Sequence, residues 1–175
     1  MATKYLSGEL FNTTIYLKLN ELNEKNINDI IYHKLKNSNE GICNNNGYVL
    51  KNSINIINKS IGKIVNVDSD SLIEYSIKYQ ADILSPKEND IINCYIDNIN
   101  KLGIIAYIKL SDVSNKISEI DQENLSSSPF IIIIPEKEID NISNYNINDN
   151  INIIVSATRI KYKSDKIQII GKIDN

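Results

Sequence analysis

The residue types that perform catalysis or hold metal ions are few in this chain and lie far apart. The two cysteines, Cys43 and Cys94, form no CxxC pair, and the one histidine, His33, has no second histidine or acidic cluster beside it. A thiolate nucleophile needs a nearby base, and a zinc site needs closely spaced ligands. The sequence also has no glycine-rich phosphate loop, nucleophile elbow or Asp-x-Asp-x-Asp motif. We therefore expect no active site, no metal, no cofactor and two reduced, part-buried cysteines.

A short cationic segment near the C-terminus is the best candidate for binding an anion. Its members are Arg159, Lys161, Tyr162, Lys163 and Lys166. Two-residue alternation would place Arg159, Lys161 and Lys163 on one side of a hairpin, where they would neutralise a few phosphates. The same residues also fit a solvated hairpin that binds nothing.

The charge balance limits the class of partner. The net charge of the chain is −3. Residues 1–84 carry nine lysines and nine acids, and residues 85–175 carry ten cations and thirteen acids. A protein that coats duplex DNA needs a basic surplus. Any contact with nucleic acid is therefore expected to be local and weak.

Near-perfect two-residue alternation runs from Ile73 to Ile83 and predicts a long strand with one buried face. The expected buried residues are Ile73, Tyr75, Ile77, Tyr79, Ala81 and Ile83. The pattern stops at Ser85-Pro86, and a second β-rich pattern follows without a flexible linker. This organisation predicts two modules, residues 1–85 and 86–175.

The first module reads as one helix on a small antiparallel sheet. Apolar residues at Ile27, Ile30, Ile31 and Leu35 have helical spacing, which predicts an amphipathic helix. The expected elements are a helix over 21–36 with Asn20 as its N-cap, and strands at 13–19, 47–56 and 72–84.

The second module reads as a five-stranded OB-fold barrel. The expected strands are 90–98, 103–110, 130–134, 150–158 and 166–173. A four-residue loop, 99–102, would join the first two strands, with Gly103 free to adopt a positive φ. The acidic excursion 111–128 is expected to be a mobile surface loop. The fold class is thus α+β, mostly β. The most apolar segment, 130–134, is about a quarter of a membrane span, so no membrane contact is expected.

Several segments together resemble one protein family. Residues 40–50, Glu-Gly-Ile-Cys-Asn-Asn-Asn-Gly-Tyr-Val-Leu, are similar to the Glu-Gly-x-Cys-turn-Gly-Tyr segment of the stalk subunit of multisubunit RNA polymerases. That family comprises the seventh subunit of eukaryotic RNA polymerase II and its archaeal counterpart. Further segments agree in order and spacing across essentially the whole chain: Gly62-Lys63-Ile64, residues 75–81, Ser85-Pro86, Gly103 and residues 169–173.

The resemblance implies a non-catalytic subunit whose first module, a tip domain, docks near the base of the polymerase clamp. The docking surface would be the loop of Ile61, Gly62, Lys63 and Ile64. Large and small core subunits of the polymerase are then the expected partners, and the family's stalk protein usually pairs with a small helical subunit as well. The alternative for 61–64 is a strand-end turn with ordinary core isoleucines.

The resemblance also implies that the barrel faces nascent single-stranded RNA. Tyr95 and Tyr107 would provide stacking platforms on the first two barrel strands. The cationic segment would contact phosphates from the link between the last two strands. However, Ile104-Ile105-Ala106 replaces an aromatic residue often found after the hairpin glycine. That departure predicts weak binding.

Two other classes of function remain open: a free-standing OB-fold protein that binds single-stranded RNA, and a structural adaptor without RNA binding. Lysine outnumbers arginine 18 to 1, a bias typical of A+T-rich genomes. A large DNA virus and an A+T-rich cell are both consistent with it. The expected location is cytoplasmic, in a viral factory or virion, for a viral protein, and nuclear otherwise.

Overall fold

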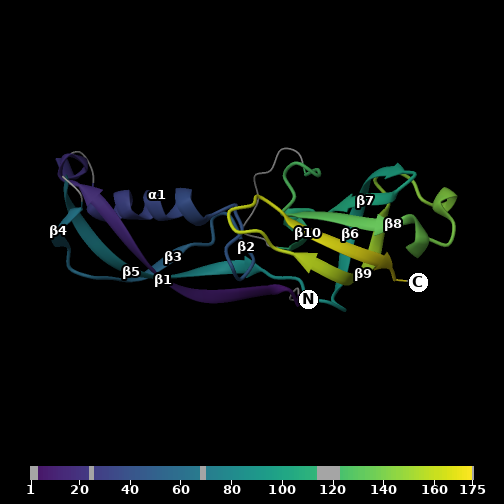
Figure 1. The fold of residues 1–175 in the computed structure, drawn as a ribbon, viewed down its shortest axis with the longest axis horizontal. Helices are drawn as coiled ribbons and strands as arrows, with labels where there is room; N and C mark the ends of the chain where they lie inside the picture. Colours follow the sequence, from purple (N-terminus) through teal and green to yellow (C-terminus); the bar gives the residue numbers. More distant parts are fainter. Residues whose placement is uncertain (1–3, 24–25, 68–69, 114–122, 175) are drawn as a thin grey trace.

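A computed structural model describes residues 4–23, 26–67, 70–113 and 123–174 as a helix-on-sheet module followed by a closed barrel (Figure 1). We call the first part the tip module. The predicted fold class, α+β and mostly β with an OB-fold barrel, is confirmed. Within the described ranges no helix is long and apolar enough to cross a membrane.

One long central strand organises the tip module. β1 pairs antiparallel with β5 along its whole length, and three short strands pair in succession with the opposite edge of β5. The strands are β1 (Leu6–Lys18), β2 (Tyr48–Val49), β3 (Asn55–Lys59), β4 (Lys63–Val67) and β5 (Asp70–Leu84). The sheet therefore depends on the length and regularity of β5.

The alternation in β5 produces the expected buried face. Tyr75, Ile77, Tyr79, Ala81 and Ile83 are all buried, and they pack with Ile31 and Leu35 of the helix α1. The intervening residues face solvent or are only partly covered. The predicted strand and its orientation are thus confirmed, although β5 begins two residues earlier and Ile73, which was expected to be buried, is only partly buried because it lies beyond the main contact with α1.

The helix boundary predicted from the sequence was wrong. α1 spans Ile27–Asn39, and its N-cap is Asn26, whose side chain accepts a hydrogen bond from the Asn28 backbone N–H at 3.1 Å. A separate 3-10 turn, η1 (Leu19–Asn23), occupies the predicted start. The Glu21 carboxylate accepts hydrogen bonds from the Lys18 backbone N–H at 2.7 Å and from the Lys34 ammonium at 2.9 Å. These tertiary contacts hold residues 19–23 apart from the helix.

Two predicted strands also have different bounds. The strand expected at 13–19 begins at Leu6, because β5 offers a partner along its entire length. The strand expected at 47–56 is divided into β2 and β3 by a turn in which Asn52 adopts a φ of 58°. β4 was not predicted. Tertiary pairing with β5 decided each of these boundaries.

The second module closes into a barrel in the order β10-β8-β7-β6-β9. Its strands are β6 (Ile91–Asn100), β7 (Gly103–Tyr107), β8 (Phe130–Pro135), β9 (Asn150–Arg159) and β10 (Ile167–Ile173). Strands β8 and β10 pair in parallel, and the other pairs are antiparallel. Short helical turns lie between strands: α2 (Leu110–Val113), η2 (Glu136–Glu138) and η3 (Ile142–Asn144).

The first barrel hairpin is tighter than predicted. β6 continues to Asn100 and β7 starts at Gly103, so the loop has two residues rather than four. Gly103 adopts a φ of 130°, as expected. A Cβ at this position would lie 2.0 Å from the backbone oxygen of Ile134 on β8. Glycine is required here because the hairpin passes directly against the neighbouring strand.

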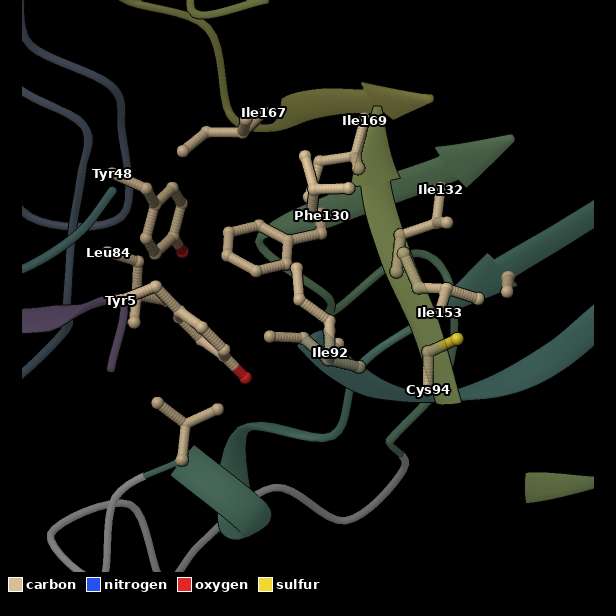
Figure 2. Packing of buried hydrophobic residues seen from close by; sticks show 14 of the residues in the cluster. Tyr5, Tyr48, Leu84, Ile92, Cys94, Phe130, Ile132, Ile153, Ile167 and Ile169 are labelled. Atoms are coloured by element: carbon tan, nitrogen blue, oxygen red, sulfur yellow. The ribbon is translucent and has the colours of Figure 1, made fainter. Parts of the chain in front are cut away.

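The two modules share one hydrophobic core at their junction. Tyr5, Tyr48 and Leu84 from the tip module approach Phe130 of the barrel (Figure 2), and the Tyr5 and Phe130 ring centroids are 5.8 Å apart. The backbone N–H of Cys43 donates to the carbonyl of Ser164 at 2.7 Å, and the N–H of Lys163 donates to the carbonyl of Cys43 at 2.8 Å. The path of the chain divides near residue 85, but the packing continues across it.

Residues 114–122 of the predicted surface loop lie outside the described residues. The described end of the 111–128 segment is anchored, because the Lys166 ammonium donates hydrogen bonds to the carbonyls of Leu125, Ser126 and Ser128. The buried Ser128 hydroxyl accepts from the Ile108 N–H at 3.1 Å. The segment that leads back into β8 is therefore held in place.

Candidate docking and nucleic-acid surfaces

The docking loop, residues 61–64, leads into β4, the strand labelled at the end of the molecule away from the barrel (Figure 1). Ile61 and Gly62 connect β3 to β4, and Lys63 and Ile64 begin β4. The Ile61 side chain is 89% exposed and that of Ile64 is 74% exposed. These isoleucines are therefore not core residues, but the segment is a strand-end turn between β3 and β4, and its docking role stays a prediction.

Gly62 allows the docking loop to lie flat on the sheet. A Cβ at this position would lie 2.7 Å from Ile73 Cγ2 and 2.8 Å from Tyr75 Cζ. The backbone therefore passes directly over two side chains of β5, and this contact directs Ile61 outward. Ile57 and Val67, on the flanking strands, are 49% and 43% exposed. The loop is thus an apolar projection that can be desolvated in a preformed groove.

The two predicted stacking tyrosines face each other across β6 and β7. Tyr95 pairs with Tyr107 in the register, and their ring centroids are 5.9 Å apart. Tyr107 is buried, and the Lys109 ammonium lies 4.0 Å from the centroid of the Tyr95 ring. A nucleobase would have to displace Lys109 to stack on Tyr95.

The surroundings of this tyrosine pair are acidic. Burial raises the pKa of both phenols. The carboxylate of Asp112 raises the pKa of Tyr95 further, and those of Asp97 and Glu123 raise the pKa of Tyr107. These same carboxylates repel phosphates. The two tyrosines lie on the first two barrel strands, as predicted, but their surroundings disfavour RNA.

The cationic segment forms a polar depression beside the junction of the modules. Its lining residues are Arg159, Lys161, Ser164, Lys166 and Gln168, and its volume is about 250 Å³. Arg159 ends β9 opposite Gln168 on β10. Arg159 and Lys161 are both exposed to solvent. Both charges are therefore available to phosphate groups at this depression.

Three other members of the cationic segment are placed differently. Lys163 adopts a φ of 62° in a turn and lies outside the depression, because the strand alternation ends at Arg159. Its ammonium lies 5.7 Å from the ring of Tyr162, which is itself 61% exposed. The Lys166 ammonium is engaged by three carbonyls, and burial lowers its pKa. Arg159 and Lys161 are thus the pair best placed for a phosphate.

An apolar row on the outer face of the barrel was not predicted. Ile105 on β7, Ile133 on β8, Ile170 on β10 and Ala157 on β9 lie opposite one another in the register. Ile133 and Ile170 are 41% and 47% exposed. The sequence of β8 is an unbroken apolar run, and such a run predicts a strand that is buried on both faces. The exposed face was therefore not recognised from the sequence. Strict alternation from the buried Ile132 would have found it.

The cysteines are buried and poorly suited to chemistry. Burial raises the pKa of Cys94 to about 12. Burial, with the charge of Asp165, raises the pKa of Cys43 to about 11. Both thiols are therefore protonated near neutral pH. Among the described residues, no group of histidine, cysteine and acidic side chains has the arrangement of a metal site.

Comparison with known proteins adds no assignment: no family model matches the chain, and the search of curated proteins finds no match.

Proposed function

We propose that this chain is a non-catalytic stalk subunit of a multisubunit DNA-directed RNA polymerase. In this role the docking loop inserts at the base of the clamp, and the barrel lies beside nascent RNA during transcription. The sequence has no Asp-x-Asp-x-Asp motif, so in this proposal the metal ions of polymerisation are held by other subunits.

The observation that carries the proposal is the exposure of Ile61 and Ile64 at the end opposite the barrel. The exposure of two isoleucine side chains to water is unfavourable, and burial in a groove of a partner would remove that exposure. The shared core around Tyr5 and Phe130 supports the same function, because it joins the docking end to the barrel as one body.

The depression formed by Arg159 and Lys161 supports a modest contribution to RNA binding. Two cations neutralise about two phosphates, which gives weak affinity without sequence preference. Such binding suits a subunit that is held near RNA by the rest of an enzyme, because a high local concentration replaces affinity.

Affinity purification of the tagged full-length chain from its native source tests this function. We expect the large polymerase subunits to co-elute in stoichiometric amounts. Ile61→Asp combined with Ile64→Asp should abolish co-elution, because two charges would be buried without partners. The matched control is Leu102→Asp, at a barrel side chain that is 83% exposed. Co-elution of the loop variant at the wild-type level would reject the docking assignment.

A structural adaptor without RNA binding is the second candidate. The burial of Tyr107, the Lys109 ammonium over Tyr95 and the outer apolar row favour it. Ultraviolet crosslinking of nascent RNA within the assembled polymerase separates the two. Crosslinks that are lost with Arg159→Ala and Lys161→Ala support the RNA role, whereas the absence of any crosslink to this chain supports the adaptor.

A further inference from the structure

The outer edge of β1 is a free strand edge. The Tyr5 carbonyl accepts from the Ser85 N–H, so odd-numbered residues of β1 direct their backbone groups toward β5. Even-numbered residues therefore direct theirs outward. Within the part of the chain that the structure describes, no hydrogen bond uses the backbone groups of Gly8, Leu10, Asn12 or Thr14, and all four residues are exposed.

The far end of this edge is closed by side chains of the same molecule. The Tyr16 carbonyl accepts from the Lys34 ammonium at 3.1 Å, and the Lys18 N–H donates to the Glu21 carboxylate at 2.7 Å. Natural edges are usually protected by charges, prolines or short length, and residues 8–14 contain one charged residue, Glu9, and no proline. The open window thus runs from Gly8 to Thr14 and matches a short added strand.

The side chains around the window define the chemistry of that strand. Leu10 is 58% exposed, and it lies on the outer face of the sheet. Lys78, also exposed on that face, is the β5 partner of Asn12, and Glu9 lies on the opposite face. The Glu9 carboxylate already accepts a hydrogen bond from the Asn46 side chain at 2.6 Å. The complementary segment therefore has an acidic residue opposite Asn12 and an apolar residue opposite Leu10.

A second copy of this chain does not meet these requirements. No symmetric pairing centred on Leu10, Phe11 or Asn12 places an acidic residue opposite Asn12, because Asn12 would face Gly8, Leu10 or itself. Four outward-facing residues also form a contact far below the roughly 1,000 Å² of a stable interface. The window therefore suits a partner that is already held elsewhere on the tip module.

We infer that residues Gly8–Thr14 of β1 receive an extended segment of the polymerase subunit that binds the docking loop, and that this segment adds a strand to the tip sheet. This inference rests on the function proposed above. It adds a second contact, which is made mainly by the backbone of β1. Strand β1 and residues 61–64 lie on opposite sides of β5 in the sheet.

Residue-resolved amide hydrogen exchange tests the inference on the full-length chain, alone and bound to purified polymerase core that lacks this subunit. The N–H groups of Gly8, Leu10, Asn12 and Thr14 should exchange at least about tenfold more slowly when bound. Those of Ser7, Glu9, Phe11 and Thr13, which face β5, should be slow in both states. Asn12→Pro removes an outward N–H and should weaken core binding about tenfold, whereas Asn12→Ala should not.

Three other outcomes would each reject a different proposal: the stalk function, the added strand or the assigned partner. Failure of the wild-type chain to bind core would overturn both the stalk function and the added strand. Binding with unchanged exchange at the four outward amides would overturn the strand alone. Protection that rises with the concentration of the chain, without core, would identify a second copy as the occupant and overturn the assigned partner. A melting temperature for Asn12→Pro close to that of Asn12→Ala confirms that the proline variant is folded.

Discussion

The tip module and the barrel differ in how they treat the unpaired edges of a β-sheet. The barrel closes through β6 and β9, which leaves no free edge among its described strands, and its core is filled by side chains such as Phe130 and Ile132. The tip sheet remains open at β1 and exposes Ile61 and Ile64 at its far end. Closure pairs every barrel strand on both edges, whereas an open sheet with apolar projections suits a module that completes itself against a partner.

The largest expected effect comes from the place where the two modules meet. Phe130→Ala should reduce the free energy of unfolding by about 3–5 kcal/mol, because it removes a fully buried ring that contacts Tyr5. Denaturant unfolding, followed by circular dichroism, should remain a single transition for the wild type. Ile170→Ala, at an exposed barrel position, is the control and should change stability little. Two separate wild-type transitions would show that the modules are energetically independent.

Substitution of one glycine in each module compares how rigidly the two modules hold their backbones. Gly103→Ala in the barrel should cost at least about 2 kcal/mol, because the residue has a φ of 130° and faces a rigid backbone oxygen. Gly62→Ala in the tip should cost about 1 kcal/mol, since the Ile73 and Tyr75 side chains it meets can shift. Thermal melting of both variants checks the order. A larger loss for Gly62→Ala would mean that the open sheet is the stiffer module.

Alkaline pH should reduce the stability of the whole fold through a buried thiol in the shared core. Cys94 has a pKa raised from 9.0 to about 12 in the folded state, so its stabilising contribution is complete below pH 9 and is lost as pH rises toward 12. At pH 10.5 this thiol alone should cost about 2 kcal/mol. Denaturant titrations at pH 8 and pH 10.5 measure the loss, and Cys94→Ala should reduce it. An equal loss in that variant would exclude the thiol as the cause.

The smallest effect concerns phosphate contacts. For single-stranded RNA binding, the logarithm of the binding constant falls linearly with the logarithm of the salt concentration. Replacing Arg159 and Lys161 by Ala should make this slope shallower by about 1.4, or about 0.7 for each cation. Lys163→Ala should leave the slope unchanged, because that residue lies outside the depression. Filter binding over a salt series measures both. An equal effect of all three changes would restore the arrangement predicted from strand alternation.

The sequence determined those features that depend on local periodicity. The alternation from Ile73 to Ile83 predicted both the central strand and its buried face, and the spacing of short β-rich segments predicted the barrel. A positive φ at Gly103 was also predictable, because few other residues tolerate a tight turn of this kind. The exposure of Ile61 and Ile64 could be proposed from residue types, but not decided by them.

Only the tertiary structure decided features that depend on residues distant in the chain. Asn26, and not Asn20, caps α1, because Glu21 bonds to Lys18 and Lys34. Lys166 is engaged by carbonyls about forty residues earlier, and that contact removes it from the anion-binding pair. The free edge of β1 exists because β5 bonds to one side of it and no described strand bonds to the other. Periodicity fixes which face of a strand is buried, but which edge is paired depends on long-range hydrogen bonds.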